Sequence, residues 1–138
     1  DAADPKTMPV LGGLCFGMSM GRPFPTIYHF AEIDGQLTTI RMPTYEQNSI
    51  IQVAATGAAF LLIHRNALKA MADHNFNEAF PFFQETQNGK DPVGEDLTFC
   101  LRLAALGIPV HVHTGVRIGH HKTHVITEES FLAAQPKE

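Results

Sequence analysis

Apolar and polar positions alternate through the first half of the chain in a way that predicts several β-strands. Residues 26–33 and 36–41 are rich in β-branched and aromatic side chains and flank the pair Asp34-Gly35. Asp and Gly tolerate the backbone angles of a two-residue turn, so the sequence predicts a β-hairpin here. Further apolar runs predict strands at 10–16, 50–54 and 58–63.

Two stretches rich in Gly, Pro or polar residues interrupt the predicted strands and helices. Residues 17–25 contain two Gly, two Pro and two Met, and the prolines exclude a central strand, so we expect a loop. Residues 84–93 are polar and include Gly89, Asp91 and Pro92, which also predicts a loop.

The second half of the chain changes to helical spacing. Residues 65–74 carry apolar side chains on one stripe, and residues 95–106 repeat them at 97, 100, 101 and 104. Gly107 is placed as the stop of the second helix. Short strands are expected at 108–113 and 116–118, followed by a terminal helix at 127–134. The order of elements predicts an α/β domain with a mixed sheet and flanking helices.

Length and composition narrow the class of protein. The chain has 138 residues, enough for one domain, with 44% hydrophobic and 17% charged residues. A net charge of −4 argues against nucleic-acid binding, which favours an excess of Lys and Arg. No apolar run approaches the roughly 20 residues of a membrane span. We therefore expect a cytoplasmic protein that is not transmembrane, with Cys15 and Cys100 as buried, reduced thiols.

Two adjacent acids, Glu95 and Asp96, stand at the start of the second predicted helix, directly after Gly94. One interpretation is structural, because acids in a first turn interact favourably with the helix dipole. The other is chemical: a loop delivers the acids to the end of an apolar helix, where a carboxylate can act as a general base. Spacing alone leaves both open.

Histidines and one glycine are the remaining candidates for chemistry. The chain has eight His, five of them between His111 and His124. His120 follows Gly119 at a predicted strand end, which makes it the best candidate for a metal ligand. Thr56-Gly57 either eases a bend or lets a ligand lie against the backbone.

The ordered motifs resemble a known family. Residues 10–16 (VLGGLCF), 55–65 (ATGAAFLLIHR), 94–102 (GEDLTFCLR) and 118–120 (IGH) together look like the acceptor-side half of a family 2-like GT-A glycosyltransferase of bacterial or phage type. The resemblance implies a metal-dependent enzyme that moves a sugar from a nucleotide-diphosphate sugar to an acceptor hydroxyl.

The same resemblance implies roles for particular residues. Asp96 would be the base or orient the acceptor, Glu95 would adjoin it, His120 would be a late ligand of Mn²⁺ or Mg²⁺, and Thr56 and Gly57 would line the sugar or acceptor pocket.

The chain departs from this family pattern in one large respect. It has no Asp-x-Asp motif and no nucleotide-binding half, and residues 1–5 read like the tail of a helix. We therefore expect residues 1–138 to be a single domain, a C-terminal fragment that pairs with a missing N-terminal half and is poorly active alone.

Two other hypotheses remain open at this point. The chain is alternatively a non-enzymatic binding or scaffold module with incidental or structural-metal histidines. A third hypothesis is a metal hydrolase built on His111, His113, His120 and the two acids. The sequence does not specify the sugar, the acceptor or the stereochemical outcome.

Overall fold

The structure is a computed structural model that describes most of the chain. The described residues are 4, 6–19, 21–33, 35–75, 77, 79–89, 91–121, 123 and 128.

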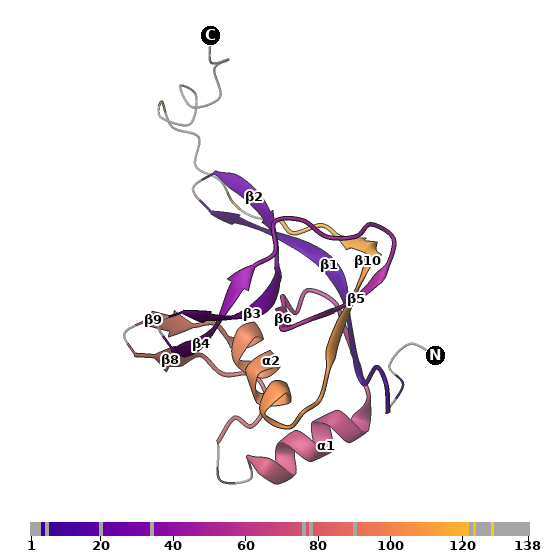
Figure 1. Cartoon of the computed structure of the whole chain (residues 1–138), viewed down its shortest axis with the longest axis vertical. Helices are drawn as coiled ribbons and strands as arrows, with labels where there is room; N and C mark the ends of the chain where they lie inside the picture. The colour runs from indigo at the N-terminus through magenta and orange to yellow at the C-terminus, as the bar shows by residue number, and fades with distance from the viewer. Residues whose placement is uncertain are drawn as a thin grey trace.

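A five-stranded mixed sheet forms the body of the protein (Figure 1). Its central pair is parallel and joins β1 (Val10–Ser19) to β10 (Val110–Ile118). The strand β5 (Ile50–Val53) pairs antiparallel with β10. On the other side of β1, β7 (Leu61–Ile63) pairs with its first part and β2 (Arg22–Pro25) with its last part, both antiparallel. The predicted α/β class and the mixed sheet are confirmed.

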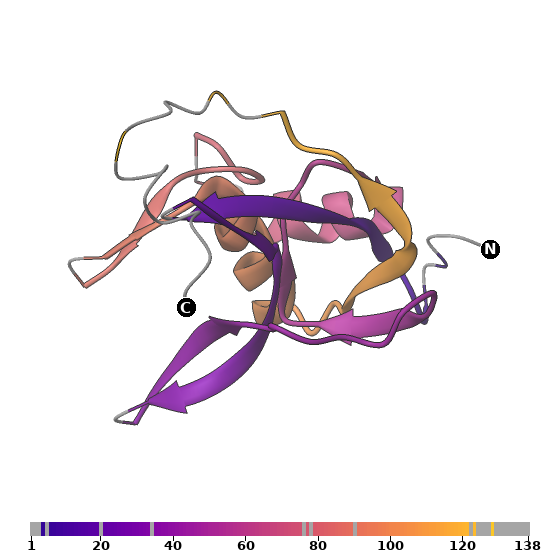
Figure 2. The same ribbon diagram turned by 90° about the horizontal axis from the view of Figure 1, so that it is seen from above.

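Two hairpins project from this body. The first joins β3 (Ile27–Ile33) to β4 (Gln36–Arg41), with β6 (Ala55–Thr56) pairing at its base. The second joins β8 (Thr86–Asn88) to β9 (Asp91–Val93). Figure 2 shows both hairpins extending from the same side of the molecule.

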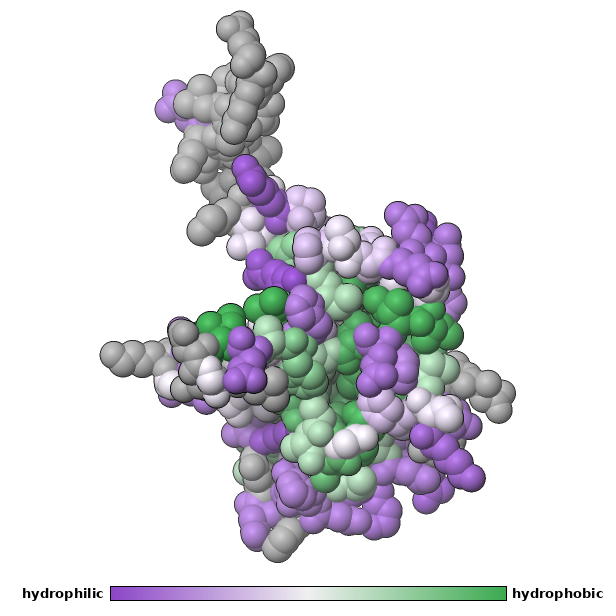
Figure 3. All heavy atoms as spheres, viewed as in Figure 1, coloured by the Kyte–Doolittle hydropathy of each residue, from purple (hydrophilic) through white to green (hydrophobic). Residues whose placement is uncertain are grey.

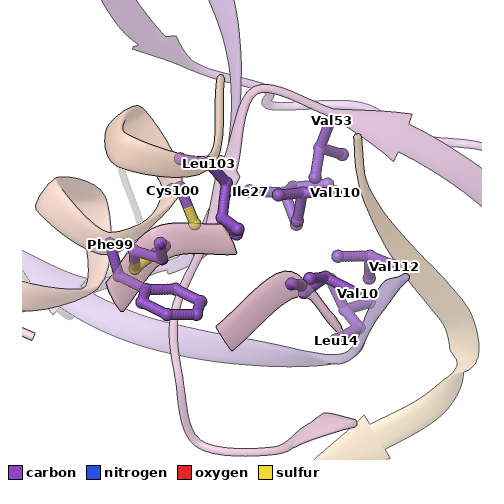
Figure 4. Close-up of a cluster of buried hydrophobic side chains, with 12 residues drawn as sticks. Val10, Leu14, Ile27, Val53, Phe99, Cys100, Leu103, Val110 and Val112 are labelled. Atoms are coloured by element: carbon purple, nitrogen blue, oxygen red, sulfur yellow. The ribbon is translucent and has the colours of Figure 1, made fainter. Parts of the chain in front are cut away.

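Two helices complete the core. The helix α1 (Arg65–His74) buries Ala67 and Met71, and α2 (Glu95–Ala105) buries Phe99, Cys100 and Leu103 among other side chains. These side chains meet Val and Leu from β1, β5 and β10, and Ile27 from β3 (Figure 4). Figure 3 shows the surface in the same view as Figure 1. Mainly hydrophobic residues cover the middle of this face, where α2 and β10 lie.

Local signals determine the helix ends. At α1, the Nδ1 atom of His64 accepts a hydrogen bond from the Asn66 amide at 3.2 Å, so an imidazole caps the helix. Beyond α2, Gly107 has a φ of +68°, the left-handed conformation that glycine adopts at helix stops. The two helices and the β3–β4 hairpin confirm their predictions, as do Cys15 and Cys100, which are buried and free.

The predicted loop at 17–25 is wrong, because β1 continues to Ser19 and pairs with β2. The Thr26 amide donates to the Cys15 carbonyl at 3.0 Å. Along an antiparallel strand, the backbone groups of successive residues point alternately toward the partner strand and away from it. The Thr26 amide points toward β1, so the nitrogens of Pro23 and Pro25 point away from it. An edge strand tolerates such prolines without losing a ladder hydrogen bond.

Three further boundaries differ from prediction. The predicted loop at 84–93 contains the β8–β9 hairpin, whose turn includes Gly89 at a φ of +63°. The two strands expected at 108–113 and 116–118 are the single strand β10, which shifts its register against β1 between Gly13 and Leu14. The strand expected at 58–63 is shorter, because only β7 is extended. The terminal helix expected at 127–134 lies, except for residue 128, outside the described residues.

Candidate functional site

The two predicted acids occupy the first turn of α2 but have different surroundings. Glu95 is exposed, whereas Asp96 is half-buried. One carboxylate oxygen of Asp96, Oδ2, accepts a hydrogen bond from the backbone amide of Ala58 at 3.1 Å. In the part of the chain that the structure describes, no hydrogen bond reaches the other oxygen, Oδ1. The structure thus fixes the Asp96 carboxylate on one side and leaves the other side able to accept a proton.

The segment that holds Asp96 is itself fixed by packing. The Gly57 amide donates to the Thr26 carbonyl at 2.9 Å, and a Cβ at Gly57 would lie 2.7 Å from Thr26 Oγ1 and 2.9 Å from Cys15 Sγ. Thr56 is fully buried, and its carbonyl accepts from the Cys100 thiol at 3.8 Å. Close packing is thus the visible reason for a glycine at position 57. The role of Thr56 and Gly57 in lining a sugar or acceptor pocket stays a prediction.

Two thiols lie behind this segment. Cys15 Sγ is 2.6 Å from Thr26 Oγ1, a hydrogen bond in which either atom can be the donor. Burial raises the pKa of the Cys100 thiol to about 11; a backbone hydrogen bond with Thr56 acts in the opposite direction, and the nearby charge of Asp96 adds to the rise. The Cys100 thiol is therefore protonated at neutral pH and is not a nucleophile.

His120 lies at the end of β10, beside β1. Its Nδ1 atom is 3.2 Å from the Phe16 carbonyl oxygen. A carbonyl can only accept a hydrogen bond, so Nδ1 carries the proton and Nε2 keeps its lone pair when the ring is neutral. This arrangement is typical of a histidine that binds a metal through Nε2.

His120 also lines a hollow of about 210 Å³ between the β1–β2 hairpin and the end of β10. The lining residues are Phe16, Gly17, Met18, Pro23, Ile118, Gly119 and His120. A second hollow of similar volume lies between α2, β3 and β5, and Cys100, Phe30 and Gln52 are among its lining residues. Asp96 lines neither of these two hollows.

No hydrogen bond joins Asp96 to His120 in the described part of the chain, and neither of the two hollows is lined by both side chains. Asp96 accepts from the amide of Ala58, the preceding residue Gly57 lies against Cys15, and His120 binds the carbonyl of Phe16, which follows Cys15.

A set of contacts that the sequence did not predict holds residues 80–86 against α2. The rings of Phe83 and Phe99 stack with centroids 4.3 Å apart. Thr86 and Thr98 share a side-chain hydrogen bond of 2.8 Å. Arg102 donates to the carbonyls of Phe80 and Phe82 and to the Gln84 side chain, at distances of 2.6, 3.2 and 3.0 Å. These contacts position the β8–β9 hairpin, which leads directly into the two acids.

The remaining histidines do not assemble a metal site in the described part of the chain. His111 and His113 lie on β10 opposite Gln52 and Ile50 of β5. Burial lowers the pKa of His111, whose Nδ1 atom has no hydrogen-bond partner. Among the described residues, no group of three or more His, Cys, Asp or Glu side chains is arranged to hold a metal ion. The metal hydrolase hypothesis therefore has no ligand cluster here.

Comparison of the chain with models of known protein families, with curated protein sequences and with solved structures finds no match in any of the three. Among the described residues, no helix combines the length and apolar character that a membrane span requires. Function must therefore be argued from the residues themselves.

Proposed function

We propose that the chain is the acceptor-side half of a glycosyltransferase in which Asp96 accepts the proton of the attacking hydroxyl. The observation that carries this proposal is the Asp96 carboxylate, held through Oδ2 by the Ala58 amide at 3.1 Å. A base must be positioned before it can act. The hydrogen bond to Oδ2 orients the Asp96 carboxylate, and Oδ1 stays available to the acceptor hydroxyl. The resemblance of residues 94–102 to the acceptor-side motif of GT-A enzymes supports the same role.

The surroundings of Asp96 suit this chemistry. The N-terminal end of a helix carries partial positive charge, which stabilises the carboxylate form that a base requires. The buried thiol of Cys100, one helical turn further along α2, is protonated at neutral pH and does not compete for the proton. Glu95 is exposed beside Asp96 and is proposed to contact the acceptor.

The donor is proposed to be a nucleotide-diphosphate sugar held mainly by residues outside this chain. The chain has no Asp-x-Asp motif, so it contributes the acceptor half only. Thr56 and Gly57 are buried, and in this proposal they fix the Ala58 amide against Asp96.

The described residues do not by themselves form a Mn²⁺ or Mg²⁺ site. These ions prefer oxygen ligands, and His120 provides a single nitrogen in a hollow that no carboxylate lines. The dependence on Mn²⁺ or Mg²⁺ thus stays a prediction, and no step of the proposed reaction is assigned to a metal here.

The test is an activity comparison in the complete reading frame that encodes the chain. Release of nucleoside diphosphate is followed with a panel of nucleotide-sugars and simple sugar acceptors, with Mn²⁺ added. We expect Asp96→Asn to lose roughly 100-fold or more of the rate, since general-base catalysis contributes that much, with an unchanged melting temperature. Asp73→Asn is the matched control, because Asp73 is an exposed acid on α1 that forms an ion pair with Lys69. Wild-type rates in Asp96→Asn would exclude the role of Asp96.

The alternative is a non-enzymatic binding module. The lack of a three-ligand metal cluster among the described residues favours it. The binding-module hypothesis predicts that calorimetry detects no heat of binding with any nucleotide-sugar. It also predicts no Asp-x-Asp motif upstream in the reading frame. The proposed transferase predicts the opposite result in both measurements.

A further inference from the structure

The hollow beside His120 has a composition of its own. Seven of the described residues line it, and among the side chains of these seven only Met18 and His120 carry an atom with a lone pair available for a ligand. The other walls are the apolar side chains of Phe16, Pro23 and Ile118 and the backbone of two glycines. Met18 is 47% exposed, so its thioether is accessible from outside.

Strand pairing brings these two side chains together from distant parts of the sequence. In the parallel pair, Cys15 of β1 lies opposite Ile118 of β10. The chain that follows Ile118 therefore runs alongside the residues that follow Cys15, and His120 binds the Phe16 carbonyl there. On the other side of β1, Met18 lies opposite Pro23 of β2, which closes the hollow.

The tautomer of His120 leaves its Nε2 atom available to bind a ligand. Because the Phe16 carbonyl takes the Nδ1 proton, Nε2 is the nitrogen with a free lone pair. A ligand on Nε2 must then be a proton donor or a metal ion. The ring is fixed by a backbone carbonyl, as it is in many metal-binding histidines.

The second lone pair, on the thioether of Met18, distinguishes between metals. Mg²⁺, Ca²⁺ and Mn²⁺ select carboxylate, carbonyl and water oxygens, whereas thioether sulfur selects Cu(I). Apolar walls also disfavour a strongly hydrated ion. We propose that this hollow binds a soft monovalent cation, Cu(I), between Met18 Sδ and His120 Nε2. This proposal does not depend on the glycosyltransferase function.

The experiment uses Ag(I) as the probe, because it shares the soft character of Cu(I) and has no redox chemistry in air. The purified chain is titrated with silver nitrate in chloride-free buffer and followed by native mass spectrometry and calorimetry. We expect one Ag(I) per chain, a shift of the His120 Nε2 resonance, and at least tenfold weaker binding in Met18→Leu and in His120→Ala. Met42→Leu is the matched control, because Met42 packs against the core away from the hollow and should leave binding unchanged.

Other outcomes overturn the proposal. Ag(I) taken up by the two buried thiols would bind equally well to wild type, Met18→Leu and His120→Ala. Circular dichroism must show that both variants are folded, and Met18→Leu keeps the volume of the side chain for that reason.

Discussion

The Asp96 carboxylate accepts a hydrogen bond from the Ala58 amide at 3.1 Å, although the two residues lie 38 positions apart. This bond joins the first turn of α2 to the segment between β6 and β7. It gives Asp96 a structural role in addition to any chemical one. A loss of activity on substitution therefore has to be separated from a loss of stability.

Substitution of Asp96 should separate the two roles. Asp96→Ala removes the acceptor from the half-buried Ala58 amide and the charge from the helix start, so we expect it to lower the free energy of unfolding by about 1–3 kcal/mol. Asp96→Asn keeps an oxygen that accepts the bond and should cost less than about 1 kcal/mol. Urea denaturation measures both. Glu95→Ala, at an exposed neighbour, is the control, and an equal effect of Glu95→Ala and Asp96→Ala would show that the Ala58 bond contributes nothing.

A methyl group should destabilise the protein at one glycine and have little effect at another. Gly57→Ala places its Cβ 2.7 Å from Thr26 Oγ1 and 2.9 Å from Cys15 Sγ, in a cluster made of the half-buried Thr26 and the buried Cys15. Overpacking of this kind costs about 1–3 kcal/mol. At Gly94 a Cβ meets nothing within 4 Å and φ is −62°, so Gly94→Ala should change stability little. Thermal unfolding of the two variants provides the comparison, and a neutral Gly57→Ala would mean that the cluster has room to adjust.

The parts of the fold that short-range patterns specify were predicted well. The β3–β4 hairpin, the apolar stripe of α2 and the stop at Gly107 each depend on neighbours within a few residues. Pairing partners are different, because they depend on contacts between distant residues. The prolines at 23 and 25 indicated a loop, and only the register with β1 shows that their nitrogens face away from the ladder.

The same distinction applies to the candidate site. The sequence identified Asp96 and His120 from their places at element ends, which are local features. It did not identify their partners, the Ala58 amide and the Phe16 carbonyl, because a backbone group has no signature in a sequence. The place of Met18 and His120 beside one hollow was missed for a related reason. One side chain lies in a segment predicted to be a loop, and the hollow exists only because that segment is a β-hairpin.

Arg102 should contribute more to stability than its place near a helix surface suggests. Its guanidinium donates to two backbone carbonyls and one amide side chain, and it thereby holds residues 80–84 against α2. Arg102→Ala leaves these acceptors without their donor and should cost about 2–3 kcal/mol. Arg102→Lys should recover only part of this, since an ammonium lacks the planar fork.

The control for Arg102 is an exposed ion pair of similar chemistry. Lys69 and Asp73 lie 2.6 Å apart on α1, with side chains 71% and 65% exposed. Such pairs contribute about 0–1 kcal/mol, so Lys69→Ala should be nearly neutral. Guanidinium chloride denaturation of the three variants tests the contrast, and equal effects of Arg102→Ala and Lys69→Ala would contradict it.

The buried thiol of Cys100 should make stability fall in alkaline solution. Burial raises its pKa from an ordinary value of 9.0 to about 11 in the folded chain. Between these two values the unfolded chain loses the proton while the folded chain keeps it, so rising pH favours unfolding. The contribution of the buried, protonated Cys100 thiol to the free energy of unfolding is complete below pH 9.0 and is lost as pH rises towards about 11. Two pKa units correspond to roughly 3 kcal/mol. Urea denaturation between pH 8 and 11, roughly the window that these pKa values define, measures the fall.

Cys100→Ala is the decisive variant, because tyrosines and lysines also titrate in this range and affect both proteins alike. Its free energy of unfolding should fall less steeply with pH than that of the wild type, even though its value at neutral pH is lower through the lost side chain. Parallel slopes in the wild type and Cys100→Ala would show that the Cys100 thiol is solvated enough to ionise at its ordinary pKa. The packing of α2 against Thr56 would then be looser than the 3.8 Å contact between Cys100 Sγ and the Thr56 carbonyl indicates.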